Sequence, residues 1–202
     1  MYSINPGGVS GGDTYSVYCD QTTDGGGWML LYAYAHTGGE NNALVDGTIP
    51  TDPTGGYSHV QLEDLEGFTE ASIADVRFYC NTSFHSRKVH FKTSDSFVTG
   101  LAFDPSQVGN SASFWNSGFT VLEGHTGYLP YDVNGAYNEN NNAVDGGFDG
   151  GFWSFPFYQN EDGRYFWTMR GINQAYWACD DDYDANGAAY TTLHQVWVRM
   201  AS

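Results

Sequence analysis

The clearest early pattern in the chain is an alternation of apolar and polar residues. In TYSVYCD, residues 14–20, every second side chain from Tyr15 to Cys19 falls on the same face of an extended chain. A period of two is typical of a β-strand with one buried face. The apolar run GWMLLYAYA follows three successive glycines. Residues 14–35 therefore predict two strands that are joined by a loop at residues 21–27.

Five later segments carry comparable strand signals, namely residues 75–81, 87–94, 95–103, 164–171 and 194–200. Only the five residues TSFHS separate the first two segments, so we expect those two to pair with each other. The last two segments predict strands late in the chain.

Helical signals are few. Residues 59–68 are the best candidate, because the valine and leucines in this stretch lie near helical spacing with acidic residues between them. Residues 72–76 either extend this helix or form a turn. We expect no helix of any length after residue 110.

Residues 104–163 are mostly predicted loop, rich in glycine, asparagine, aspartate and aromatic residues. Loops of this length inside a compact domain are usually functional or ordered by metal. The chain shows no internal repeat and no linker-like break in composition. We therefore expect a single domain over residues 1–202, α+β in class and mostly β, with an antiparallel sheet.

The charge balance narrows the choice of partners. The chain has 24 acidic and 7 basic residues, a formal net charge of −17. Nucleic acid and anionic membrane surfaces require Lys and Arg, so both are disfavoured. No apolar run approaches the roughly 20 residues of a membrane-spanning helix, so no membrane insertion is expected. The balance suits calcium, a basic partner or a neutral ligand such as a sugar, and it also suits an ordinary acidic surface.

Three cysteines, Cys19, Cys80 and Cys179, lie far apart in the sequence. None forms a CxxC pair, which disfavours a structural zinc site. Because their number is odd, one thiol is free or its partner is missing.

The segment VYCDQTTDGGGW, residues 17–28, resembles the opening hairpin of the fibrinogen-related domains. That family includes fibrinogen C-terminal domains, ficolins, tachylectins and, more distantly, intelectins, and its usual run is close to V-Y-C-D-M-T-T-D-G-G-G-W. Only Gln21 departs from it. The preceding YSINPGG is similar to the family's Y-x-I-x-P lead-in, and the ending HQVWVRM fits its terminal strand. The family's later W-W-x-x-C-x-x-x-N pattern and its Asp-x-Asp calcium loop are not evident here.

The resemblance implies a fibrinogen C-terminal-like domain that is secreted and has short helices and long metal-ordered loops. In the family, Cys19 would pair with a cysteine just upstream of the Y-x-I segment. The alternative is that Cys19 pairs with Cys80 or Cys179. We favour Cys80–Cys179 as the internal disulfide, although sequence alone leaves the connectivity open.

Two acidic clusters are candidate calcium sites, because calcium takes about six to eight oxygen ligands from carboxylates, amides and backbone. The candidate ligands of the first cluster are Asp132, Asn134, Asp145 and Asp149. Those of the second are Asp180, Asp181, Asp182 and Asp184. The first cluster is not an EF-hand loop, because no Glu stands at the twelfth position from Asp132. Asx-rich turns and solvated acidic loops carry the same composition without metal. A third and weaker candidate is HTGGENN, which is similar to an intelectin HENN run, with His36, Glu40, Asn41 and Asn42.

A sugar site needs polar groups for hydroxyls and an aromatic face for the C–H side of the ring. Aromatic residues near the acidic clusters are the candidates, namely Trp153, Tyr176, Trp177 and Tyr183. Tyr176 and Trp177 stand immediately before the second cluster, which favours that cluster for recognition. The alternative is that these tryptophans are core residues, which is the more common place for a tryptophan.

Catalytic signals are weak, since neither G-x-S-x-G nor H-E-x-x-H occurs, and we expect no enzymatic activity. Asn81-Thr82-Ser83 fits the N-glycosylation sequon and lies between two predicted strands, where an exposed turn is expected.

The resemblance and the acidic aromatic loops together predict an extracellular, calcium-dependent, lectin-like module. Its expected ligands are glycans on cell or microbial surfaces, and a homo-oligomer would add avidity to weak single sites. The alternative is a protein-binding adhesion or matrix module in which calcium is purely structural.

Overall fold

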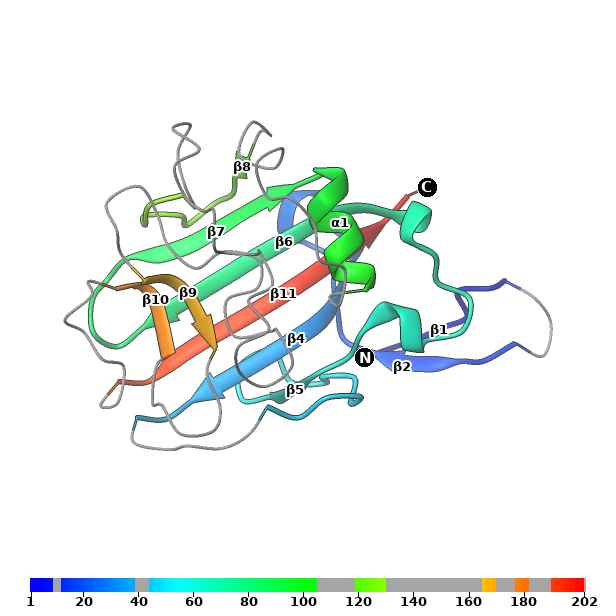
Figure 1. The fold of residues 1–202 in the computed structure, drawn as a ribbon, viewed down its shortest axis with the longest axis horizontal. Coiled ribbons are helices and arrows are strands. Elements are labelled where there is room, and N and C mark those ends of the chain that lie inside the picture. The colour runs from blue at the N-terminus through cyan, green and yellow to red at the C-terminus, as the bar shows by residue number, and fades with distance from the viewer. Residues whose placement is uncertain are drawn as a thin grey trace.

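A computed structural model describes residues 1–8, 12–38, 44–104, 119–129, 165–169, 177–181 and 190–201, and its central feature is an antiparallel sheet (Figure 1). The strands follow one another across this sheet in the order β3 (Cys19–Asp20), β4 (Trp28–His36), β11 (Thr192–Met200), β6 (Ile73–Thr82), β7 (Lys88–Thr93) and β8 (Thr120–Val121), with β5 (Tyr57–His59) also paired to β4. The late strand β11 thus lies between β4 and β6, near the middle of the sheet.

Two smaller antiparallel sheets complete the described strands. They are β1 (Tyr2–Ile4) with β2 (Tyr15–Val17), and β9 (Tyr165–Met169) with β10 (Trp177–Asp181). The expectation of a mostly β chain with antiparallel pairs and few helices is confirmed for the described residues. The helices in the described part of the chain lack the length and apolar character that a membrane span requires.

The predicted hairpin around the three glycines is confirmed. Cys19 pairs with Met29 and Asp20 with Trp28 in the ladder between β3 and β4. The connecting turn contains the short 3₁₀ helix η1 (Thr23–Gly25).

Four successive residues in this turn have left-handed backbone, with φ of 48° at Asp24 and of 84°, 82° and 76° at the three glycines that follow. A residue with a Cβ is strained at positive φ, whereas glycine, which has no Cβ, adopts this conformation readily. At Gly26 there is a second reason, because a Cβ there would lie 2.5 Å from the carbonyl oxygen of Gln21. The indole of Trp28 closes the turn by donating to the Thr23 carbonyl oxygen at 2.9 Å.

The prediction of a strand over residues 95–103 is wrong, because these residues form the helix α1 (Ser96–Phe103). Asp95 stands just before the helix, and its carbonyl oxygen accepts from Thr99 N–H at 2.9 Å. Val98, Leu101 and Ala102 are buried, which is the spacing of one helical face.

The helix expected over residues 59–68 is also wrong, apart from one 3₁₀ turn, η2 (Leu62–Asp64). Its apolar residues do reach the core, since Val60 and Leu62 are buried. Gly67 ends the stretch with a φ of 93° that an α-helix cannot accommodate. A further 3₁₀ turn, η3 (Glu70–Ser72), leads directly into β6, so the segment after it continues as a strand and not as a helix.

The main core lies on the face of the large sheet that α1 and the β9–β10 hairpin cover (Figure 1). A bulge in β4 shapes this face. Val196 lies opposite Tyr32 and Trp197 opposite Leu30, so Leu31 is the extra residue between them. Leu31 and Tyr32, although adjacent in the chain, therefore both join the main core.

The second face of the sheet carries a smaller apolar cluster that includes Trp28 and Trp197. The guanidinium of Arg77 lies 5.0 Å from the ring centroid of Trp28 and 4.4 Å from that of Trp197. Arg199 lies 4.5 Å from the Trp28 ring centroid. A cation over an aromatic face is attracted by the quadrupole of the ring. These contacts between arginine and tryptophan therefore stabilise the second face of the sheet. Arg77 is also paired with Asp20 at 2.7 Å.

Candidate functional site

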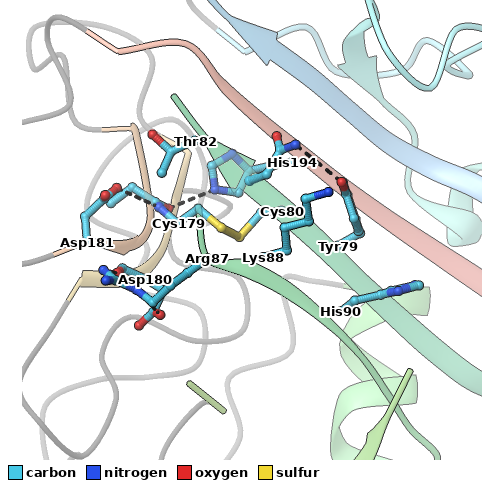
Figure 2. The surroundings of a disulfide bond; sticks show 12 residues. Tyr79, Cys80, Thr82, Arg87, Lys88, His90, Cys179, Asp180, Asp181 and His194 are labelled. Carbon is cyan, nitrogen blue, oxygen red and sulfur yellow. Dashed lines mark hydrogen bonds and ion pairs between the residues drawn. A yellow bond between two sulfur atoms is a disulfide. The ribbon is translucent and has the colours of Figure 1, made fainter. Parts of the chain in front are cut away.

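A disulfide joins the large sheet to the β9–β10 hairpin (Figure 2). It connects Cys80 on β6 with Cys179 on β10, with their Cα atoms 5.8 Å apart, and both residues are fully buried. The expected pairing is therefore confirmed. Cys19 is the free cysteine among the described residues and is half-buried.

Asp180 follows the disulfide directly and is held by Arg87 from the start of β7 (Figure 2). Arg87 Nε donates to Asp180 Oδ2 at 2.8 Å, and its terminal nitrogen donates to the Asp180 carbonyl oxygen at 2.6 Å. The backbone N–H of Tyr128 donates to the same carboxylate oxygen at 3.1 Å. Asp180 is completely buried and has a left-handed backbone with φ of 58°. These contacts hold it in a conformation that few residues other than glycine adopt.

Asp181 is held in a similar way by the turn between β6 and β7. His85 Nε2 lies 3.1 Å from Asp181 Oδ1 and 3.1 Å from the Asp180 carbonyl oxygen. The other carboxylate oxygen of Asp181 accepts from Cys179 N–H at 2.9 Å. We call the four side chains of His85, Arg87, Asp180 and Asp181 the clasp.

The contacts of the clasp argue against Asp180 and Asp181 as calcium ligands. A calcium ion would have to share Asp180 with a guanidinium whose positive charge opposes it. In this arrangement Asp180 is paired with Arg87 and Asp181 with His85, which fits side chains of the protein itself and not calcium. No group of three or more His, Cys, Asp and Glu side chains suited to a metal occurs within the described residues. The calcium prediction stays with the acidic residues outside those ranges.

Trp177, predicted to face a sugar, is instead a core residue with no exposed surface. Its ring stacks on His36 with centroids 4.4 Å apart and lies 5.9 Å from the ring of Tyr34. Trp177 is the first residue of strand β10, and its side chain points into the core. In the sequence, the acidic residues that follow make this strand resemble a loop. His36, a member of the weaker HENN-like candidate, is likewise buried.

His194 supports β10 from the central strand β11. Its Nε2 donates to the Ala178 carbonyl oxygen at 2.9 Å, and the side chain is fully buried. Burial lowers the pKa of His194 to about 3, outweighing the hydrogen bond to Ala178, which raises the pKa. The imidazole is therefore neutral at physiological pH.

Exposed aromatic side chains lie around the clasp. Phe84 is 41% exposed, and its ring contacts both His85 and Tyr190, with centroids 5.9 Å and 4.5 Å apart. Tyr128, whose N–H donates to Asp180, is 45% exposed. Phe84 and Tyr128 were not among the predicted site residues. Their signal in the sequence is weak, because nothing local distinguishes an exposed aromatic residue from a buried one.

The other predicted site residues lie outside the described residues, namely Asp132, Asn134, Asp145, Asp149, Trp153, Tyr176, Asp182, Tyr183 and Asp184, together with Glu40, Asn41 and Asn42. Asn81 is described and lies within strand β6, not in the exposed turn that the sequon suggested. Its side chain is half-buried and donates to Tyr79 Oη at 3.3 Å.

Two open hollows flank the turn at residues 20–24 on the second face of the sheet. One measures about 560 Å³ and is lined by residues 22–24, His90 and residues 120–123. The other measures about 420 Å³, and its lining includes Tyr18, Thr22, Thr54, Gln195 and Trp197. Sequence reasoning assigned neither hollow.

Comparisons of the chain with protein-family models, with curated proteins and with solved structures found no match. The likeness of residues 17–28 to the fibrinogen-related domains therefore remains a prediction that rests on those residues.

Proposed function

We propose that the protein is a non-catalytic, extracellular recognition module that binds glycans through the end of the molecule where the clasp lies. The observation that carries the proposal is the combination of exposed aromatic rings with a rigid base. Phe84 contacts His85 of the clasp, the backbone N–H of Tyr128 donates to Asp180, and the half-buried Tyr190 packs on Phe84. Sugars pack their C–H faces on such rings.

The rigid base lowers the entropic cost of holding a binding surface in place. The Cys80–Cys179 disulfide and the Arg87–Asp180 pair both fix strand β10. In the sequence, Asp182, Tyr183 and Asp184 follow this strand at once. Their acidic and aromatic composition agrees with a lectin-like role in which bound calcium coordinates sugar hydroxyls. An extracellular location agrees with the disulfide, because such bonds persist in oxidising compartments.

The test is a glycan array probed with the protein in calcium and again in EDTA, with thermal melts of both samples. Glycans sharing one terminal sugar and bound only in calcium would support the proposal. A melting shift without glycan binding would assign calcium a structural role and favour a protein partner. Absence of both effects would reject calcium and glycan recognition together.

Two matched variants locate the surface. Phe84→Ala removes an exposed ring next to the clasp, and Tyr2→Ala removes one that is 50% exposed on β1. We expect Phe84→Ala to weaken array binding and Tyr2→Ala to leave it unchanged. Equal effects would place the glycan elsewhere. Soluble sugar should elute the protein from a glycan, whereas a contact with a protein partner should survive.

A further inference from the structure

The hollow of about 420 Å³ on the second face of the sheet has a lining suited to a ligand of its own. It lies on the opposite side of the sheet from the disulfide, since Trp197 belongs to the second-face cluster and both disulfide cysteines belong to the main core. It therefore shares no described lining residue with the surface around the clasp.

One wall of the hollow is aromatic. Tyr18 is half-buried and meets Trp197 edge to face, with ring centroids 6.0 Å apart and planes inclined by 64°. Trp197 is only 3% exposed, so Tyr18 is the ring that a ligand would contact. An aromatic ring offers a flat apolar surface to the C–H groups of a small ring-shaped ligand.

Two turns of the same design stand at the rim. Thr22 Oγ1 donates to Asp20 Oδ1 at 2.9 Å, and Thr54 Oγ1 donates to Asp52 Oδ1 at 3.0 Å. Because an ionised carboxylate only accepts hydrogen bonds, each threonine hydrogen is committed to its aspartate. Both residues line the hollow, and each hydroxyl oxygen can still accept a hydrogen bond. They favour a ligand that donates hydrogen bonds.

Gln195 supplies a donor whose orientation is fixed from both sides. Trp197 Nε1 can only donate, and it meets Gln195 Oε1 at 3.0 Å. The amide nitrogen then donates to the Pro53 carbonyl oxygen at 2.5 Å. An amide nitrogen carries two hydrogens, so one remains for a ligand.

The charges at the hollow are balanced. Its described lining includes no Lys, Arg or His, and its one carboxylate, Asp20, is paired with Arg77 at 2.7 Å. Burial raises the pKa of Asp20, but hydrogen bonds from Thr23, Thr22 and Arg77 outweigh it and hold that pKa far below its usual range. The carboxylate therefore stays ionised and keeps Thr22 oriented. An anionic ligand would find no cation in this described lining, and the one carboxylate of the lining is already paired with Arg77.

We propose that this hollow binds one neutral monosaccharide unit without calcium. Sugar hydroxyls donate to Thr22 and Thr54, one hydroxyl accepts from Gln195, and the C–H face of the ring packs on Tyr18. This site is additional to the surface around the clasp and does not depend on the function proposed for it.

The test uses the neutral methyl glycosides of glucose, mannose and galactose at millimolar concentration in EDTA, observed by saturation-transfer NMR. N-acetylneuraminic acid and tetramethylammonium serve as the anionic and cationic probes. Thr54→Val removes the acceptor while keeping the side-chain shape, and Thr54→Ser keeps the acceptor. Tyr18→Ala removes the aromatic wall, and Phe84→Ala is the control on the other face.

We expect at least one neutral glycoside to bind in EDTA. Loss of one hydrogen bond should weaken its binding about fivefold in Thr54→Val. Thr54→Ser and Phe84→Ala should bind as the unaltered protein does, and Tyr18→Ala should lose the signal while melting as a folded protein. The proposal is overturned if no neutral glycoside binds, if Thr54→Val binds normally, or if the charged probes bind better. Because calcium is absent and Phe84 is not involved, these outcomes are separate from failure of the surface around the clasp.

Discussion

Arg87 donates to Asp180 twice, once to the carboxylate and once to the carbonyl oxygen, across 93 positions of sequence. The two contacts differ in kind. The first balances a charge that has no exposed surface, and the second satisfies a buried backbone oxygen. Together they tie the start of β7 to the end of β10, so the position of the acidic segment depends on an arginine far away in the chain.

Replacing Arg87 with methionine should destabilise the protein by about 2–4 kcal/mol, because the buried Asp180 carboxylate loses its cation. Arg87 is itself 28% exposed, which keeps the expected loss below that of a fully buried pair. Urea unfolding at pH 7 measures the change. Lys88→Met, which removes an exposed positive charge from the next residue, is the matched control and should shift stability by no more than about 0.5 kcal/mol. Similar small losses in both variants would show that the clasp contributes little to folding.

Acid should destabilise the protein before its carboxylates titrate. Burial lowers the pKa of His194 to about 3 and that of His59 to about 4, with Asp46 raising the latter in part. Both histidines take up protons more readily when unfolded, near pH 6.5, so stability is complete above that pH and falls as the pH decreases.

Between pH 6.5 and pH 5, each of these histidines should cost about 1.5 kcal/mol of unfolding free energy. Urea unfolding at several pH values measures the slope. His194→Gln keeps a donor for the Ala178 carbonyl oxygen and cannot gain a proton, so its slope should be shallower by the contribution of this one histidine. His90 and His125, whose pKa values burial also lowers, keep their own contributions in the variant. A variant slope equal to that of the unaltered protein would mean that His194 is not held neutral by burial.

Gly26→Ala should be far more harmful than Gly25→Ala, although the two glycines have nearly the same φ of 82° and 84°. At Gly25 a new Cβ meets nothing within 4 Å, whereas at Gly26 it meets the Gln21 carbonyl oxygen at 2.5 Å. The positive φ should cost about 1–2 kcal/mol at Gly25. At Gly26 the backbone cost is at least as large, because its ψ of −161° lies in a region that is essentially restricted to glycine. The clash should add about 2 kcal/mol at Gly26 alone. Denaturant unfolding of the two variants gives the difference directly, and equal losses would contradict the geometry of this turn.

The local parts of the fold were predictable from the sequence. The hairpin around the glycines follows from alternation on either side of a turn, and both signals lie within residues 14–35. Strands β6, β7 and β11 were likewise found by their apolar runs. By contrast, the residues of α1 predict a strand because Val98 and its neighbours are apolar. The opposing signal is Asp95, whose carboxylate accepts from Val98 N–H at 3.4 Å at the start of the helix.

The site was much less predictable, for a physical reason. A run of aspartates looks solvated unless the side chains that contact it are known, and Arg87 and His85 lie more than 90 positions before their partners. No local pattern gives such a pairing. The turns at Asp20 and Asp52 did have a local signal, since both contain Asp-x-Thr, but their meeting at one hollow depends on the sheet.

Reduction of Cys80–Cys179 should destabilise the protein by about 4 kcal/mol, since the bond closes a loop across 99 positions of sequence and limits the unfolded chain. The measurement is urea unfolding with and without reductant. It is best made in a Cys19→Ser background, so that reduction acts on one bond among the described cysteines. The Cys19→Ser change alone should leave the free energy of unfolding of the oxidised protein within about 0.5 kcal/mol, because Cys19 has no disulfide partner among those residues.

Because β10 carries Asp180 and Asp181, reduction should also weaken any glycan binding near the clasp. Binding in the hollow beside Tyr18 should persist in protein that remains folded. An unchanged midpoint after complete reduction would show that the packing of Trp177 and the clasp hold β10 in place without the covalent bond.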